Sequence, residues 1–147
     1  MTYTEEKRDL FSVPGEYYLA HCISADFGMG KGIAVEFNRR FNMRNILREK
    51  YPDQINGWRR YRYIGKCILE GRVLNLVTKE RYFHKPTYES MENALLEMKS
   101  MCSCHGIKKV AMPIIGCGLD RLKWDKVSAI IQETFADTDI EILVCKQ

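Results

Sequence analysis

The segment LAHCISADFGMGKGIAVEFNRRF, Leu19–Phe41, decides the fold class. Its apolar start is typical of a buried strand, and a loop with glycine at every second position, Gly28–Gly32, follows. Ile33, Phe37 and Phe41 then fall on one face of a helix. Alternating glycines let a ligand approach backbone N–H groups, and a helix that begins at Ile33 directs its positive end to the same place. The segment therefore predicts a strand, an anion-binding loop and a helix, with phosphate as the first candidate ligand.

Two common phosphate motifs do not fit this loop. A Walker loop, G-x-x-x-x-G-K-[ST], would need glycine at Ala25 and a hydroxyl at Gly32. The dinucleotide fingerprint G-x-G-x-x-G would need a third glycine at Ile33. A flexible glycine turn at the start of a helix is the alternative that stays open.

The rest of the chain alternates strands with helices. Strands buried on both faces between helices indicate an α/β fold, with a mixed sheet between helix layers. The length of 147 residues predicts a single domain over 1–147. Helices are predicted over 33–41, over 43–51, from the cap Thr87 through Cys102, and over 124–135. Strands are predicted over 3–11, 16–24, 108–113 and 139–146, and the segment 61–79 is predicted to supply both strands of a hairpin.

Composition and charge limit the classes of function. No apolar run reaches the roughly 18 residues of a membrane span, and the N-terminus has no apolar leader, so we expect a soluble, unprocessed protein. Six cysteines scattered through apolar runs favour free thiols in a reducing, intracellular compartment, the cytoplasm or the nucleus. Cys102, Cys104 and His105 lack a second pair of ligands, so no metal is expected. A net charge of +4 favours anionic ligands.

Two glycine-rich loops come directly after predicted strands. Ser24–Gly32 follows the strand LAHCIS, and Pro113–Asp120, PIIGCGLD, follows KKVAM. Ligand sites of open α/β sheets lie beyond the carboxyl ends of strands, where such loops lead into helices. Backbone N–H groups of both loops could hold one diphosphate between them, so the glycines are expected to admit a pyrophosphate.

The strings LAHCIS, MGKGIAVEF, HKPTYE and MPIIGCGLDRLKW resemble the macrodomain family. Within it they are most similar to the terminal ADP-ribose protein glycohydrolase type, also described as O-acyl-ADP-ribose deacylases. The resemblance runs from Arg8 to the last predicted strand. It implies a three-layer α/β/α macrodomain with a central mixed β-sheet that binds ADP-ribose without a metal or other cofactor.

The resemblance also implies which residues contact ADP-ribose. Asp9, preceded by Arg8 where many macrodomains have glycine, would accept a hydrogen bond from the adenine amino group. Ser24 either binds the ribose or holds its own loop, and Cys117 contributes its backbone rather than a nucleophilic thiol. The expected binding residues are Asp9, Leu10, Ser24, Gly30, Gly32, Ile33, Ala34, Pro113, Gly116, Cys117, Gly118 and Leu119.

For the chemistry, the resemblance implies a lysine and an aspartate, which by the motif match are Lys85 in HKPTYE and Asp120 in GCGLD. The asparagine that many other macrodomain hydrolases use is absent from the first loop, which reads SADF. A neutral lysine amine can attack the anomeric carbon of the ribose and form a Schiff base, while Asp120 takes and returns a proton. Lysine is normally protonated, so burial around Lys85 is expected to help it lose its proton.

Three functions stay open. The first is a hydrolase that removes mono-ADP-ribose from Glu and Asp side chains of proteins and deacylates O-acyl-ADP-ribose. The second acts on ADP-ribosylated DNA bases, which the basic and aromatic run Trp58–Tyr63 would serve, although that run also suits a hairpin strand with one face in water. The third is a reader that binds ADP-ribose without turnover.

Three aromatic side chains near these motifs have two interpretations each. Tyr82 and Phe83, just before HKPTYE, either stack on the adenine or a ribose or fill the core. His21 lies in an apolar strand and is expected to be a core histidine with its hydrogen bonds satisfied rather than a ligand.

Overall fold

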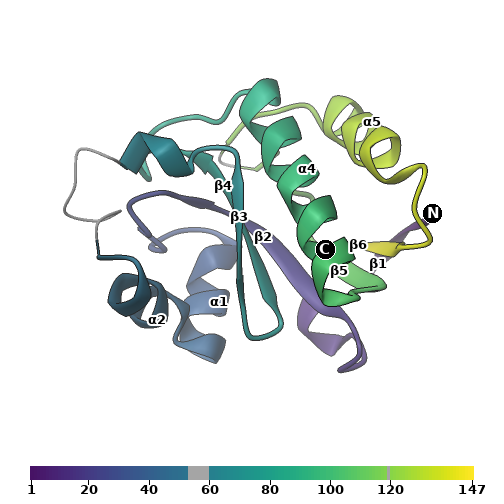
Figure 1. Ribbon diagram of the computed structural model, residues 1–147, viewed down its shortest axis with the longest axis horizontal. Coiled ribbons are helices and arrows are strands. Elements are labelled where there is room, and N and C mark those ends of the chain that lie inside the picture. Colours follow the sequence, from purple (N-terminus) through teal and green to yellow (C-terminus); the bar gives the residue numbers. More distant parts are fainter. Residues whose placement is uncertain (53–59, 119) are drawn as a thin grey trace.

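A six-stranded mixed sheet runs through the middle of the computed structural model, which describes residues 1–52, 60–118 and 120–147. The strand order is β1-β6-β5-β2-β4-β3 (Figure 1). β3 pairs antiparallel with β4, and the other neighbours pair parallel. The strands are β1 (Thr2–Lys7), β2 (Tyr18–Ser24), β3 (Lys66–Glu70), β4 (Val73–Lys79), β5 (Lys109–Met112) and β6 (Glu141–Lys146).

Helices cover both faces of the sheet (Figure 1). One face carries α1 (Ile33–Phe41) and α2 (Met43–Lys50), and the other carries α4 (Tyr88–His105) and α5 (Trp124–Phe135). Two short 3-10 helices, η1 (Leu10–Ser12) and η2 (Arg60–Tyr63), lie between strands. The predicted three-layer α/β/α architecture is therefore confirmed.

Alternate residues of the strands pack into the two helical layers. In β2, Leu19 and Ile23 belong to the buried cluster that contains Phe37 of α1. Ala20 of the same strand belongs to the cluster that contains Leu95 of α4. Side chains on successive strand residues point to opposite faces, so a strand that is apolar at nearly every position needs a helix layer on each side.

The helix boundaries follow local hydrogen bonding. Thr87 caps α4 as predicted, because its hydroxyl accepts from Ser90 N at 3.0 Å and the Ser90 hydroxyl accepts from Thr87 N at 3.0 Å. Asn42 ends α1 in the left-handed conformation, with φ of 52°, which asparagine tolerates well.

Two predicted strands are wrong in part. The first ends at Lys7 rather than Phe11, because the Asp9 carboxylate accepts from Phe11 N at 3.0 Å and starts η1. The predicted hairpin begins at Lys66, since Arg60–Tyr63 forms η2 instead of a strand. Trp58 and Arg59, the start of the basic and aromatic run, lie outside the described residues.

The thiols and the membrane question can be checked in the described part of the chain. All six cysteines are free, and Cys67, Cys102 and Cys145 are buried. No described helix combines the length and the apolar character that a bilayer crossing requires.

His21 sits in the core beneath α1, as expected, but only one of its ring nitrogens is bonded. Its ring stacks on Phe37 with centroids 3.8 Å apart. Nε2 donates to Asn75 Oδ1 at 2.7 Å, whereas Nδ1 has no hydrogen-bond partner among the described residues. Burial lowers the pKa of His21 to about 4, and the bond to Asn75 opposes that shift only in part.

This histidine should make the stability of the fold depend on pH. An unfolded histidine titrates near pH 6.5, so below that pH the unfolded state binds a proton that the folded state takes up only near pH 4. The folded state should lose about 2 kcal/mol of stability between pH 7 and pH 5 through this group. Urea unfolding at both pH values measures the loss, and His21→Gln, which does not titrate, should lose about 2 kcal/mol less over the same interval. Equal losses in the two proteins would exclude His21 as the source.

Candidate active site

The carboxyl ends of three parallel strands meet at one edge of the sheet. β2 lies between β4 and β5, and it pairs parallel with both. The loops that follow these strands, 25–32 after β2, 80–87 after β4 and 113–123 after β5, are therefore neighbours. This is the position in which an open parallel sheet binds its ligand.

A largely buried ion pair joins two of these loops. Lys79, the last residue of β4, places Nζ 2.6 Å from Asp120 Oδ1 in the loop after β5. Only 14% of the Lys79 side chain and 16% of the Asp120 side chain are exposed. The backbone carbonyl of Lys79 also accepts from Ala25 N at 2.9 Å, which fixes the start of the loop after β2. Lys79 thus connects all three loops, and the sequence analysis missed it.

Asp26 ties the loop after β2 to the loop after β4. One of its carboxylate oxygens accepts from the Ser24 hydroxyl and from Gly28 N, and the other accepts from Tyr82 N at 3.1 Å. Ser24 is buried, so its hydroxyl holds the loop through Asp26. Of the two roles considered for Ser24, the contacts favour the support of its own loop.

The glycines of the first loop lie in different structural environments. A Cβ on Gly28 would lie 2.9 Å from the Cβ of Tyr82, so Gly28 is needed for protein packing. Gly30 and Gly32 are exposed, and Gly32 is the N-cap of α1 with φ of 65°. No side chain caps this helix, so its first N–H groups near Ile33 and Ala34 lie at a positive helix end.

The second loop packs tightly at Gly116 and opens toward Gly118. A Cβ on Gly116, which has φ of 73°, would lie 2.6 Å from Met91 Cε, whereas one on Gly118 would meet no atom within 4 Å. Pro113 is half-buried at the start of the loop. Leu119, an expected contact residue, lies outside the described residues.

The thiols beside this loop are poor nucleophiles. Burial raises the pKa of Cys117, and the Asp120 carboxylate adds to that effect. Burial and the Asp120 carboxylate also raise the pKa of Cys22 in β2. A raised pKa leaves little thiolate at neutral pH, so Cys117 is a poor nucleophile. A ligand contact through its backbone stays a prediction.

Asp9 lies exposed where β1 leaves the sheet, and Leu10 beside it is buried. The arginine that replaces the usual glycine does not prevent the turn, since Arg8 N donates to Lys146 O at 2.9 Å and the guanidinium donates to the Ser12 carbonyl at 3.3 Å. The guanidinium of Arg40 lies 4.3 Å above the ring of Phe11.

Lys85 occupies a different environment from the one expected. Its side chain is exposed, while His84 is half-buried and Pro86 is buried. Burial therefore does not strip the Lys85 amine of water. Tyr82 and Phe83 are 60% and 62% exposed. The interpretation that they fill the core is therefore wrong, and stacking on the adenine or a ribose stays a prediction.

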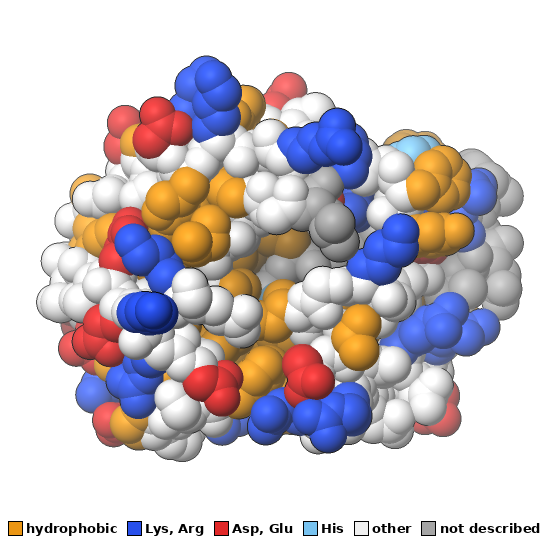
Figure 2. Space-filling view, turned by 180° about the vertical axis from the view of Figure 1, so that it is seen from behind, with side chains coloured by type: hydrophobic (Ala, Val, Ile, Leu, Met, Phe, Trp, Pro, Cys, Tyr) orange, Lys and Arg blue, Asp and Glu red, His pale blue; other side chains and the backbone are white. Residues whose placement is uncertain are grey.

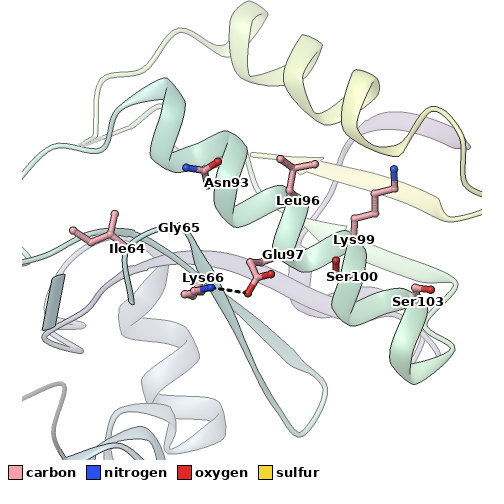
Figure 3. A pocket seen from close by; sticks show the side chains of 9 residues that line it. All are labelled: Ile64, Gly65, Lys66, Asn93, Leu96, Glu97, Lys99, Ser100 and Ser103. Atoms are coloured by element: carbon pink, nitrogen blue, oxygen red, sulfur yellow. Dashed lines mark ion pairs between the residues drawn. The ribbon is translucent and has the colours of Figure 1, made fainter. Parts of the chain in front are cut away.

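Open space on the surface is found in more than one place. Figure 2 shows a hollow near the middle of the side turned away in Figure 1, with hydrophobic side chains inside it and both basic and acidic side chains around it. A separate cavity of about 680 Å³ lies between the start of β3 and α4, beside the ion pair of Lys66 with Glu97 at 3.5 Å (Figure 3). None of the predicted site residues lines that cavity, so its volume does not identify the site.

No group of three or more His, Cys, Asp or Glu side chains in the described ranges could hold a metal ion.

Comparisons with known proteins agree with this geometry. The family model named Macro domain matches residues 66–131. The chain is 44% identical over 142 residues to the human protein ADP-ribose glycohydrolase OARD1, and the matched region covers 96% of this chain and 89% of that protein. It is 28% identical over 108 residues to the DNA ADP-ribosyl glycohydrolase of Thermus aquaticus, covering 71% of this chain and 30% of that protein. The macrodomain of Mycobacterium tuberculosis DarG has the same fold, with a TM-score of 0.85, 21% identity and coverage of 98% of this chain and 97% of that one. The chain therefore belongs to the macrodomain family.

Proposed function

We propose that this chain is an ADP-ribosyl hydrolase that releases mono-ADP-ribose from ester links to Glu and Asp side chains and deacylates O-acyl-ADP-ribose. The 44% identity to a protein named ADP-ribose glycohydrolase supports the reaction class. The observation that carries the proposal is the Lys79–Asp120 ion pair, at 2.6 Å between the two glycine-rich loops. A binding module would not need an amine and an acid at that position.

The loops suit the diphosphate of ADP-ribose. The start of α1 presents N–H groups without a side-chain cap, and the glycines before it leave room for an anion. Gly118 leaves similar room in the loop after β5. The exposed Asp9 carboxylate can accept from the adenine amino group, with the Phe11 ring close by in sequence.

Asp120 can serve as the proton acceptor for either of two amines, that of Lys79 or that of Lys85. An amine must lose a proton before it can attack, and Asp120 already accepts a hydrogen bond from Lys79 Nζ. The proton can pass along this bond, while the same carboxylate favours the charged form of the amine and so opposes the attack. Lys85, in the motif HKPTYE on the exposed turn after β4, is the other candidate for the amine.

The reaction then balances with these two side chains and one water. Lys79 Nζ forms a bond to the anomeric carbon, the bond from that carbon to the substrate carboxylate breaks, and the electron pair leaves with the carboxylate. Asp120 holds the proton from the amine. The bond between the anomeric carbon and the ring oxygen then breaks, its electron pair and one proton of the nitrogen pass to that oxygen, and a protonated Schiff base remains. Water adds to the anomeric carbon, the C–N bond breaks with its electron pair on the nitrogen, and Asp120 returns its proton to the amine. The ribose ring closes again, and one proton from the water is released. The products are free ADP-ribose and the unmodified carboxylate.

The experiment compares Lys79→Ala with Lys85→Ala on a peptide that carries glutamate-linked ADP-ribose. We expect Lys79→Ala to lose about 10³-fold in kcat, because it removes the attacking group, and Lys85→Ala to stay within about 5-fold of wild type. ADP-ribose affinity, measured by calorimetry on the same samples, should change little in either. The reverse ranking would assign the amine to Lys85, and a wild type that binds ADP-ribose without releasing it would be a reader.

The free cysteines support a reducing compartment inside the cell as the place of this activity. ADP-ribose and ADP-ribosylated proteins are then its ligands. The relative named DNA ADP-ribosyl glycohydrolase gives a specific reason to consider nucleic acid as a second carrier of the ADP-ribose.

A further inference from the structure

The strand β3 forms an open edge of the sheet. It stands last in the strand order and pairs with β4 (Figure 1), and no hydrogen bond from a described residue outside β4 reaches its backbone. Two surface hollows lie beside it, of about 680 Å³ and about 430 Å³, and Lys66 and Glu97 line both. The smaller one follows β3 from Lys66 to Leu69. Unpaired N–H and C=O groups at such an edge are a template for a further strand.

The hairpin determines which backbone groups of β3 point outward. Its turn, Gly71–Arg72, has two residues with φ of 60° at Gly71, so Glu70 and Val73, which close the turn, form a hydrogen-bonded pair. Hydrogen-bonded and non-hydrogen-bonded pairs alternate along an antiparallel ladder, so every second residue before Glu70 also bonds to β4. The N–H and C=O groups of Cys67 and Leu69 therefore point away from the sheet and are available to a partner.

Charges of both signs lie along this edge. Lys66 begins β3 and pairs with Glu97 at 3.5 Å, and Glu70 ends β3 and pairs with Lys50 at 2.8 Å. The other charged or titratable residues that line the two hollows are Arg62, Lys99 and His105. This mixture does not suit a strongly acidic or a strongly basic peptide. It suits a strand with a positive charge at one end and a negative charge at the other.

We propose that the partner is a second copy of this chain, with β3 of each copy paired antiparallel to β3 of the other. In the register centred on Ile68, the outward N–H and C=O groups of Cys67 meet those of Leu69 of the second copy. The same register places Lys66 opposite Glu70 of the second copy at both ends of the strand pair. Opposite charges in directly facing positions stabilise such a pair. The two sheets then continue as one.

The helix α4 adds a second layer to this contact. It packs on both β3 and β4, and neighbouring strands lie about 4.8 Å apart, so the two copies of α4 would lie roughly 10 Å apart on one face of the joined sheet. Helices pack against each other at about that distance. The side of α4 that lines the larger hollow carries Leu96, which is 45% exposed, and the small exposed residues Ser100 and Ser103 (Figure 3). Leu96 would be covered in the dimer.

The strand at the opposite edge of the sheet, β1, lacks this self-complementarity. In the antiparallel register that pairs all six residues of β1 with a second copy, none of its charged residues Glu5, Glu6 and Lys7 meets an opposite charge. The charge pattern therefore favours β3 over β1 as the edge that joins two copies. No residue of the proposed active site takes part in this contact, so the dimer does not depend on the proposed function.

Sedimentation velocity on the whole chain, from about 5 µM to about 500 µM, tests the dimer. We expect the wild type to change from monomer to dimer within this range. Lys66→Glu and Glu70→Lys each place like charges opposite one another at both ends, so each should weaken self-association by about 30-fold. An equimolar mixture of these two variants restores opposite charges at both ends and should associate within about 3-fold of wild type. Misfolded variants would not show this recovery.

Two more variants check the edge and the backbone contact. Glu6→Lys makes the same change of charge on β1 and should dimerise like wild type. Leu69→Pro removes an outward N–H while the bonds to β4 stay, so it should give a monomer. A wild type that stays monomeric at the highest concentration, or charge variants of β3 that dimerise like wild type, would overturn the proposal and leave this edge to an extended peptide of another protein. A loss of the dimer in Glu6→Lys alone would contradict it by moving the contact to β1.

Discussion

Asp120→Asn should reduce kcat on glutamate-linked ADP-ribose by about 10³-fold, the range that removal of a general acid and base produces. The amide has nearly the shape of the carboxylate but cannot take the proton of Lys79 Nζ, which lies 2.6 Å from Asp120 Oδ1. The backbone of the second loop and the glycines of the first are untouched, so ADP-ribose affinity should stay within about 3-fold. Single-turnover kinetics and calorimetry on one preparation measure both quantities. A variant that keeps a tenth of the activity would remove Asp120 from the chemistry.

A double variant separates the loss of chemistry from a loss of folding. Both side chains are about 85% buried, with 14% and 16% exposed, so a single change leaves one charge without its partner in a mostly dry place. Breaking such a pair typically costs about 3 kcal/mol, whereas replacing both partners with apolar groups is often neutral. Lys79→Met/Asp120→Leu should therefore unfold at a higher urea concentration than Asp120→Leu alone, yet stay inactive. If activity followed stability across these variants, the pair would be structural.

Gly116→Val should destabilise the protein by about 3 kcal/mol. A side chain at this position meets two penalties. The backbone φ of 73° is unfavourable for a branched residue, and the new Cβ would lie 2.6 Å from Met91 Cε and 3.2 Å from Leu122 Cδ1. Met91 is fully buried in the core cluster under the loop, so it has little space into which to move. Chemical denaturation of purified protein measures the effect.

Gly118→Val is the matched control in the same loop. Nothing lies within 4 Å of a Cβ there, so its stability should stay within about 0.5 kcal/mol of wild type. Equal destabilisation by both substitutions would mean that the loop, rather than the contact with α4, sets the cost.

The order of strands and helices followed from periodicity, because a core with a helix layer on each face leaves few other patterns. Thr87 was recognisable as the start of a helix, since caps are local in sequence. The end of the first strand was not recognisable. It depends on the hydrogen bond from Phe11 N to the Asp9 carboxylate, which starts η1, and hydrophobic periodicity does not reveal such a bond.

The candidate site was less accessible to sequence reasoning. The two glycine loops stood out, but Lys79 looked like the end of a hairpin strand, and its bond to Asp120 joins residues 41 positions apart. Gly28 was expected to make room for a ligand, while it makes room for Tyr82. Such contacts between loops depend on which strands are neighbours in the sheet. The position of β2 between β4 and β5 is a property of the topology, which local sequence patterns do not predict.

Lys79 closes a strand, whereas Tyr82, Phe83 and Lys85 sit on the turn that leaves it. The amine that we propose for the reaction is anchored to β4, a strand with neighbours on both sides, and the other three residues lie on the turn just outside the sheet. In the proposed function, the chemistry and the contact with the group that carries the ADP-ribose would then belong to adjoining but separate pieces of chain. A protein built this way can exchange one carrier for another by rewriting a few residues of a surface turn, with its chemistry left in place.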